Sequence, residues 1–141
     1  MTMLRHATVL VLALIYSFTS LADEIDLYGA DGRAVAYIDT SSEFEIYLWS
    51  GTPVAYLDGN NVYGFNGKHT GFFSQGVIFD HSGHAVCAVR EALTIIPAIP
   101  PIKSIPQIPP IKSIPQIPPI PPIFSNQFSR TPCAIHLSME R

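Results

Sequence analysis

The 141-residue sequence has little charge and no recognisable catalytic motif, and each shortage excludes a class of protein. Charged residues make up 13% of the chain, and the net charge is −3 at pH 7. A nucleic-acid-binding domain needs a basic face, so this composition argues against nucleic acid as a partner. The chain has no Gly-x-Ser-x-Gly, no phosphate-binding glycine loop and no cysteine–histidine zinc spacing. We therefore expect no cofactor and no metal, and assign no catalytic residue.

Long hydrophobic runs are also absent, apart from one near the start. Residues 1–22 have the order of a secretory signal: Arg5 and His6, an apolar run over residues 7–16, and small residues ending at Ala22. The apolar run is too short to cross a bilayer. We expect cleavage before Asp23, export to the periplasm or outside the cell, and no transmembrane span.

What the chain does have is a fourfold repeat between residues 25 and 89. In each copy an aromatic residue is followed four positions later by glycine, and an apolar segment follows the glycine. The pairs are Tyr28 and Gly32, Tyr47 and Gly51, Tyr63 and Gly67, and Phe79 and Gly83. Asp-Gly and Asn-Gly between apolar runs are typical of β-hairpin turns, because glycine accepts a positive φ. One hairpin cannot bury its apolar side alone, so we predict an all-β fold of four β-hairpins in a pseudo-fourfold rosette.

The repeat resembles the bacterial 4-fold beta flower domain. The resemblance is carried by residues 27–37, 46–56, 62–71 and 76–83, and residues 124–129 are similar to the tails that follow such domains. It implies the rosette fold over roughly residues 25–90. It implies no activity, cofactor or catalytic residue. We place the hairpin domain at residues 23–93.

A proline-rich segment follows at residues 94–123. Isoleucine occupies every third position from Ile96 to Ile123, and the phrase Pro-Pro-Ile-Lys-Ser-Ile-Pro-Gln-Ile occurs twice, beginning at Pro100 and Pro109. So much proline excludes an α-helix, and a polyproline II helix has three residues per turn, which puts the isoleucines on one edge. That edge needs a cover: the domain's own rim, another copy, a second protein or a membrane surface. We expect it to pack on its own domain.

Residues 124–141 form the last segment, in which alternation over residues 133–137 suggests one short strand. The chain has only two cysteines, Cys87 and Cys133. Two cysteines in an exported protein suggest a disulfide, and closing this loop would stabilise the fold by roughly 4 kcal/mol. The alternative is that Cys87 only fills the small position that alanine occupies in other repeats.

Five residues at or near the turns are candidate binding residues: Trp49, Phe65, His69, His81 and His84. Trp49 and Phe65 occupy equivalent turn positions, where they would bind a partner or contact the proline-rich segment. His81 and His84 could approach a metal together, but a turn supplies no third ligand. His69 replaces the alanine or proline of the other repeats.

These features favour an exported, non-enzymatic structural or interaction module whose partner is another protein or a component of the cell envelope. The alternative is a small envelope hydrolase or metal-binding protein that uses the histidine-bearing turns. Convergence of the histidines and acidic side chains in one pocket would favour the alternative.

Overall fold

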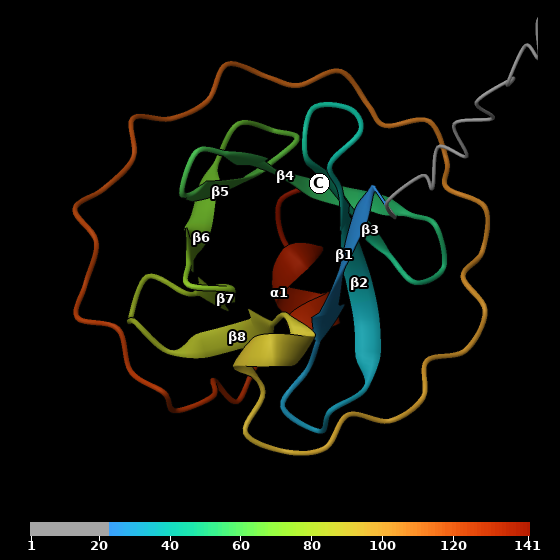
Figure 1. The fold of residues 1–141 in the computed structure, drawn as a ribbon. Helices are drawn as coiled ribbons and strands as arrows, with labels where there is room; N and C mark the ends of the chain where they lie inside the picture. Colours follow the sequence, from blue (N-terminus) through green and yellow to red (C-terminus); the bar gives the residue numbers. More distant parts are fainter. Residues whose placement is uncertain (1–22) are drawn as a thin grey trace, which may run out of the picture.

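The computed structural model describes residues 23–141, so the expected signal peptide lies outside the described residues. Eight antiparallel strands follow one another around a closed barrel, and the first strand, β1 (Glu24–Tyr28), pairs with the last, β8 (Ala85–Ala88), to complete it (Figure 1). The barrel is built from four consecutive hairpins, which confirms the predicted all-β, fourfold arrangement. Closure leaves no sheet edge exposed, which removes the usual site of aggregation through strand pairing.

The strands are short, at three to six residues, and the two helices are short as well, at three and five residues. The strands are β1 Glu24–Tyr28, β2 Ala34–Asp39, β3 Glu45–Leu48, β4 Pro53–Asp58, β5 Asn61–Gly64, β6 His69–Ser74, β7 Val77–Phe79 and β8 Ala85–Ala88; the helices are the 3₁₀ helix η1 Arg90–Ala92 and the α-helix α1 Cys133–Leu137. The register shifts just before the aromatic residue of each hairpin. Such a bulge bends the strand and strengthens its twist, which helps a small barrel to close.

The helix α1 lies in the middle of the ring of hairpins (Figure 1). Its residues Cys133 and Leu137 belong to the same core cluster as Ala36, Ala55 and Cys87 of the strands. These strand residues, each four positions after a turn glycine, are small and therefore leave room for a helix at the centre. A two-layer arrangement results, in which the barrel supplies the outer wall and α1 supplies part of the core.

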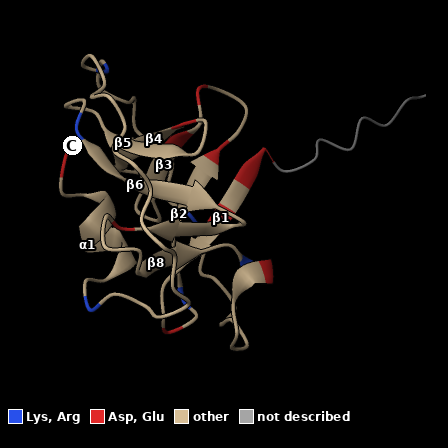
Figure 2. Ribbon diagram, turned by 90° about the vertical axis from the view of Figure 1, so that its left-hand side faces the viewer, with Lys and Arg blue, Asp and Glu red and all other residues tan. Residues whose placement is uncertain are grey.

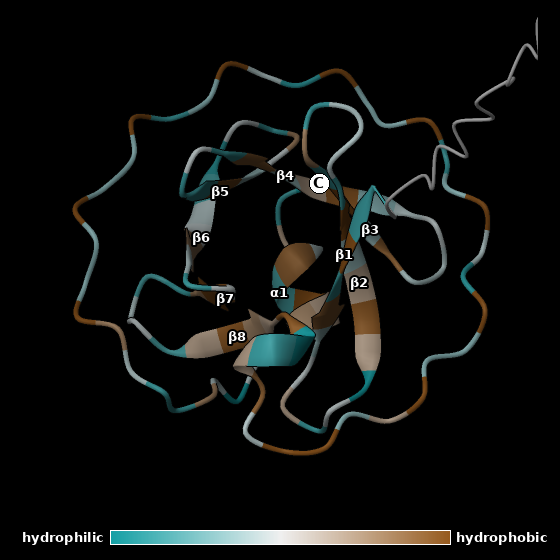
Figure 3. Cartoon of the chain, viewed as in Figure 1, coloured by the Kyte–Doolittle hydropathy of each residue, from teal (hydrophilic) through white to brown (hydrophobic). Residues whose placement is uncertain are grey.

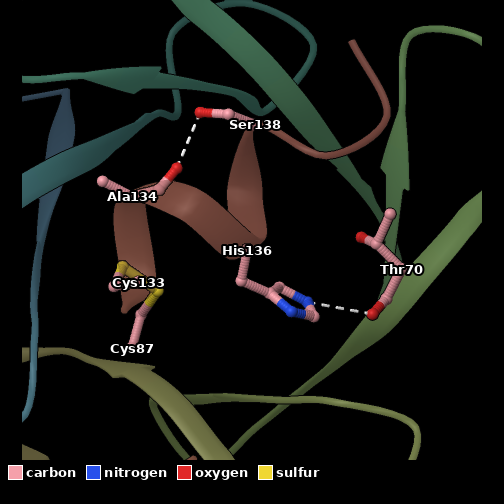
Figure 4. The surroundings of a disulfide bond; sticks show 6 residues. All are labelled: Thr70, Cys87, Cys133, Ala134, His136 and Ser138. Carbon is pink, nitrogen blue, oxygen red and sulfur yellow. Dashed lines mark hydrogen bonds between the residues drawn. A yellow bond between two sulfur atoms is a disulfide. The ribbon is translucent and has the colours of Figure 1, made fainter. Parts of the chain in front are cut away.

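The prediction of a strand over residues 133–137 is wrong, because this segment is α1. A closed barrel offers no edge for a further strand, whereas a helix satisfies its own backbone hydrogen bonds. Figure 4 shows how α1 is held: a disulfide joins Cys133 to Cys87 of β8, and His136 Nε2 donates a hydrogen bond to the carbonyl of Thr70 at 3.0 Å. The disulfide ties the end of the chain to the fourth hairpin.

Residues 96–125 form an extended ring around the outside of the barrel, here named the tail ring (Figure 1). It makes the same contact at each hairpin turn, where a tail N–H donates to the carbonyl of the turn glycine. The donors and acceptors are Ala98 and Gly32 (2.9 Å), Gln107 and Gly51 (2.9 Å), Gln116 and Gly67 (2.8 Å), and Ser125 and Gly83 (2.8 Å). Successive donors are nine residues apart, which is the length of the repeated phrase. One phrase therefore spans one quarter of the barrel.

The tail ring docks on its own domain, but the expectation that its isoleucines make the contact is wrong. All ten isoleucines of the stripe are between 89% and 97% exposed, and hydrophobic positions recur around the outside of the ring (Figure 3). An extended chain with three residues per turn has three edges. The backbone groups that bond the glycines and the lysines described below face the barrel, so the isoleucine edge faces outward.

Substitution of a turn glycine tests this docking. A Cβ at Gly51 would overlap the carbonyl oxygen of Ile105, whereas a Cβ at Gly59 would meet nothing, and both glycines have positive φ. We expect Gly59→Ala to cost only the backbone strain, about 1–2 kcal/mol. Gly51→Ala should cost in addition one displaced hydrogen bond, about 0.5–1.5 kcal/mol.

The measurements are urea unfolding and limited proteolysis of residues 96–125. The tail ring should become a protease target in Gly51→Ala and stay protected in Gly59→Ala. Equal protection in both variants would show that the glycine contacts do not hold the ring.

Candidate functional site

The junctions between neighbouring hairpins carry the side chains that hold the tail ring. At the first junction, Lys103 Nζ lies 4.7 Å from the ring centroids of both Tyr37 and Trp49. The same nitrogen is 2.7 Å from a carboxylate oxygen of Glu24 and 2.6 Å from one of Asp26. Two aromatic faces and two carboxylates therefore surround one ammonium group. We name this arrangement the first lysine cage.

The second junction repeats the first with related residues and forms the second lysine cage. Lys112, nine positions after Lys103, places Nζ 4.5 Å from the Tyr56 centroid. It lies 2.7 Å from Glu43 and 3.6 Å from Glu45. Glu43 and Glu45 stand at the repeat positions of Glu24 and Asp26, and acidic residues mark the start of β1 in Figure 2. The phrase that occurs twice in the tail ring therefore meets residues that recur in successive hairpins, and the two cages are equivalent.

The two cages are held in their charged forms. Burial disfavours the ammonium of Lys103, but its hydrogen bonds to Asp26 and Glu24 outweigh this and raise its pKa. Burial also opposes ionisation of Glu45, yet hydrogen bonds from Ser42 and from backbone N–H groups, together with Lys112, leave its pKa below the usual range. At neutral pH each cage is thus an ion cluster facing aromatic rings.

The third junction has the same framework and different chemistry. Asn61 stands where the first two junctions have Asp26 and Glu45, and Pro121 stands where the next lysine would be. His69 and His81 fill the space instead: His69 Nδ1 lies 2.8 Å from His81 Nε2, and His69 Nε2 lies 2.9 Å from Asn61 Oδ1. No lysine of the tail ring is used here.

The Asn61 contact determines which nitrogen of His69 carries its proton. An amide oxygen only accepts, so His69 donates from Nε2 and presents an Nδ1 lone pair to the N–H of His81. Burial, with a smaller contribution from His81, lowers the pKa of His69 to about 4. His69 is therefore neutral through the physiological range.

A pocket of about 320 Å³ opens beside this pair, and we name it the histidine pocket. Three histidines from distant parts of the chain meet there with polar and thioether side chains. Its lining residues are His69, Thr70, Asp80, His81, Ser82, Thr131, His136, Met139 and Glu140. Burial lowers the pKa of His136, against the effect of its bond to Thr70. Within residues 23–141, no three His, Cys, Asp or Glu side chains are arranged to hold a metal ion.

The structure separates the five candidate binding residues into four places. Trp49 is part of the first lysine cage, where its Nε1 also donates to the Pro101 carbonyl at 2.9 Å. Phe65 is buried beside Tyr56, with centroids 5.9 Å apart. His69 and His81 meet in the histidine pocket, whereas His84 lies outside its lining and 3.9 Å from Asp80.

Sequence reasoning missed Lys103, Lys112 and His136 as site residues. A signal for the two lysines existed, since the repeated phrase carries lysine at the same position each time. His136 gave no such signal in its own neighbourhood. Only the pairing of Cys133 with Cys87 brings its helix into the barrel.

The family model of the 4-fold beta flower protein matches residues 25–137. This match covers most of the chain, and the chain therefore belongs to the 4-fold beta flower family. The matched range extends beyond the hairpins and includes the tail ring and α1. No curated protein and no solved structure matches the chain. Neither helix in residues 23–141 has the length and apolarity needed to cross a membrane.

The first lysine cage makes a testable contribution to stability. Lys103→Met keeps the aliphatic stem but removes the charge from Glu24 and Asp26 and from two aromatic faces. We expect a loss of roughly 1–3 kcal/mol in the free energy of unfolding, and faster amide exchange in the adjoining part of the tail ring. The control is Lys68→Met, because Lys68 is exposed and 3.7 Å from Glu140.

The control should change stability by less than about 0.5 kcal/mol. Denaturant unfolding and hydrogen exchange measure both effects. A Lys103→Met protein as stable as the control variant would contradict an anchoring role for the cage.

The lowered pKa of His69 predicts acid sensitivity. The unfolded chain binds a proton at this residue near pH 6.5, while the folded protein resists it until pH falls to about 4. Stability should therefore fall as pH drops through this window, and His136 should add to the same trend. His69→Gln should flatten the slope of unfolding free energy against pH.

Unfolding midpoints in urea between pH 4 and pH 7.5 give that slope directly. Because the slope is compared, any uniform destabilisation by His69→Gln does not affect the conclusion. An unchanged slope would show that His69 titrates alike in both states.

Proposed function

We propose that the protein is an exported, non-enzymatic structural module that presents an apolar rim to further copies of itself. The rim consists of the ten stripe isoleucines, named the isoleucine rim: Ile96, Ile99, Ile102, Ile105, Ile108, Ile111, Ile114, Ile117, Ile120 and Ile123. The observation that carries the proposal is their near-complete exposure on a segment that is anchored to the barrel at every quarter.

Anchoring decides whether the exposed isoleucines are available to a partner. A loose tail would turn its stripe inward, because burying one isoleucine side chain is worth about 1.5–3 kcal/mol. Here the inward edge is already used by the four glycine contacts and by Lys103 and Lys112. The isoleucine rim therefore keeps facing outward, and a contiguous exposed apolar surface of this kind is typical of an interaction site.

Charge favours a second copy as the partner. The only charged residues between Ile96 and Ile123 are Lys103 and Lys112, and their side chains are turned toward the barrel with 26% and 25% exposure. Two rims can thus meet without charge repulsion, in a self-complementary contact of the kind that twofold dimers use. A bilayer is a poorer partner, because the net charge of −3 opposes binding to anionic lipid.

The alternative of a small envelope hydrolase or metal-binding protein draws support from the histidine pocket. His69 and His81 converge there with Asp80, while His84 does not. Among the described residues 23–141, no hydroxyl or thiol hydrogen bonds to either histidine of the pair. A nucleophile beside its base is what hydrolysis of this type needs, so the metal-binding half of the alternative has the better support.

Sedimentation of the mature protein over a wide concentration range tests the proposal. We expect reversible association that weakens when Ile102, Ile111 and Ile120 are all changed to serine, with no loss of folding stability, because these side chains are exposed. The matched control is Ile135→Ser, since Ile135 is 59% exposed but lies on α1.

A protein that is monomeric at every concentration would overturn self-association. Equal association by the triple variant would assign it to another surface. Flotation with neutral and anionic vesicles identifies a lipid partner, which would also overturn the proposal.

A further inference from the structure

We propose that His69 and His81 form a binding site for monovalent copper, Cu(I), with the thioether of Met139 as a third ligand. The proposal concerns the histidine pocket alone and is independent of the isoleucine rim. It gives a ligand-binding role to the third junction, where a histidine pair stands in place of a caged lysine.

The two imidazole rings are arranged end to end. Their planes differ by 19° and their centroids are 5.1 Å apart, while the facing nitrogens are 2.8 Å apart. The difference between these two distances is about twice the distance from an imidazole centroid to its own nitrogen. The two nitrogens therefore lie on the line that joins the ring centres. When His81 carries its proton on Nδ1 instead of Nε2, both facing nitrogens have a free lone pair. A metal ion between them would then have two nitrogen donors on nearly opposite sides, a geometry suited to an ion of low coordination number.

One ligand is fixed and the other is adjustable. His69 is buried in β6, and its Nε2–H is held by Asn61 Oδ1, which orients the Nδ1 lone pair toward the metal position. Metal-binding histidines usually donate their second N–H in this way. His81 is exposed on the turn between β7 and β8. A metal needs the nitrogens about 4 Å apart, at roughly 2 Å from each, so the exposed side chain of His81 would draw back by about 1 Å while the turn stays bonded to the tail ring.

The remaining donors of the pocket select the ion. Met139 lines the same pocket, and a thioether is a soft ligand that favours Cu(I). Structural zinc is four-coordinate with nitrogen, sulfur or carboxylate ligands. Within residues 23–141 not even three such side chains are arranged for it.

Competitive titration of the mature, disulfide-bonded protein tests the site. Cu(I) is added without oxygen in the presence of bicinchoninate, and Ag(I) is titrated in parallel, because it needs no reductant that would threaten the disulfide. We expect one ion per chain, and amide shifts confined to the residues around the histidine pocket.

Variants separate the proposed ligands from their neighbours. His81→Ala, at an exposed turn, should abolish competition with the chelator, and Asn61→Leu should weaken binding about 10–100-fold. Met139→Leu should weaken Cu(I) binding without affecting the fold. His84→Ala is the control and should bind as the parent does.

Each contrary result has a definite meaning. Full binding by His81→Ala, or loss of binding by His84→Ala, would overturn the assignment of ligands. Zn(II) binding at the same histidines with equal strength would overturn the choice of a soft monovalent ion. Thermal unfolding of every variant confirms that a loss of binding is not a loss of fold.

Discussion

The backbone contact between each turn glycine and the tail ring is the constraint on which the rest of the structure depends. It needs a residue without a Cβ, because Ile105, Ile114 and Ile123 bring their carbonyl oxygens against Gly51, Gly67 and Gly83. It also fixes the phase of the tail, since one contact per hairpin sets a repeat of nine residues. Once that phase is set, lysine falls toward the barrel and isoleucine falls toward the outside. The exposed rim is therefore a consequence of how the backbone is bound.

The disulfide and α1 add a second attachment from within. Cys87 lies in a position that alanine or glycine occupies in the other hairpins, so the sulfur enters the core without displacing a larger side chain. The tail ring passes outside the barrel, and the chain that follows it returns to the centre as α1. The barrel wall therefore lies between the tail ring and α1. Unfolding of either part then loosens the other, and a loop of this length closed by a disulfide gains roughly 4 kcal/mol in the chain-entropy model.

The fold was predictable from the sequence wherever a residue pattern has a single structural explanation. The aromatic–glycine pairs mark the hairpins, because a strand end followed by a tight turn accounts for the aromatic residue and for the glycine. The prediction for the isoleucines was wrong because hydrophobicity alone favours their burial. In the structure the backbone N–H groups of the tail ring and Lys103 occupy the edge that faces the barrel, which leaves the isoleucines outside. The helix α1 was misjudged since five alternating residues fit a strand as well as a helix, and only barrel closure excludes the strand. For the site, Trp49 and His81 were found from their turn positions, but the approach of His69 to His81 depends on how neighbouring hairpins meet.

Pseudo-fourfold repetition also explains why a pair of histidines can stand at one junction. A repeated scaffold supplies several equivalent pockets, and the two lysine cages are enough, with the glycine contacts, to hold the tail ring. At the third junction the tail ring is held without a lysine, because the backbone N–H of His69 donates to Gln116 Oε1 and the ring of Phe124 packs against Phe72. Asn61 therefore stands where a lysine would need a carboxylate. A neutral acceptor in that position orients an imidazole, whereas a carboxylate would have favoured its protonation and raised its pKa. The change from acid to amide thus converts a pocket that holds a lysine of the chain into one in which the neutral His69 presents its Nδ1 lone pair to His81, while the barrel around it keeps the same arrangement of hairpins.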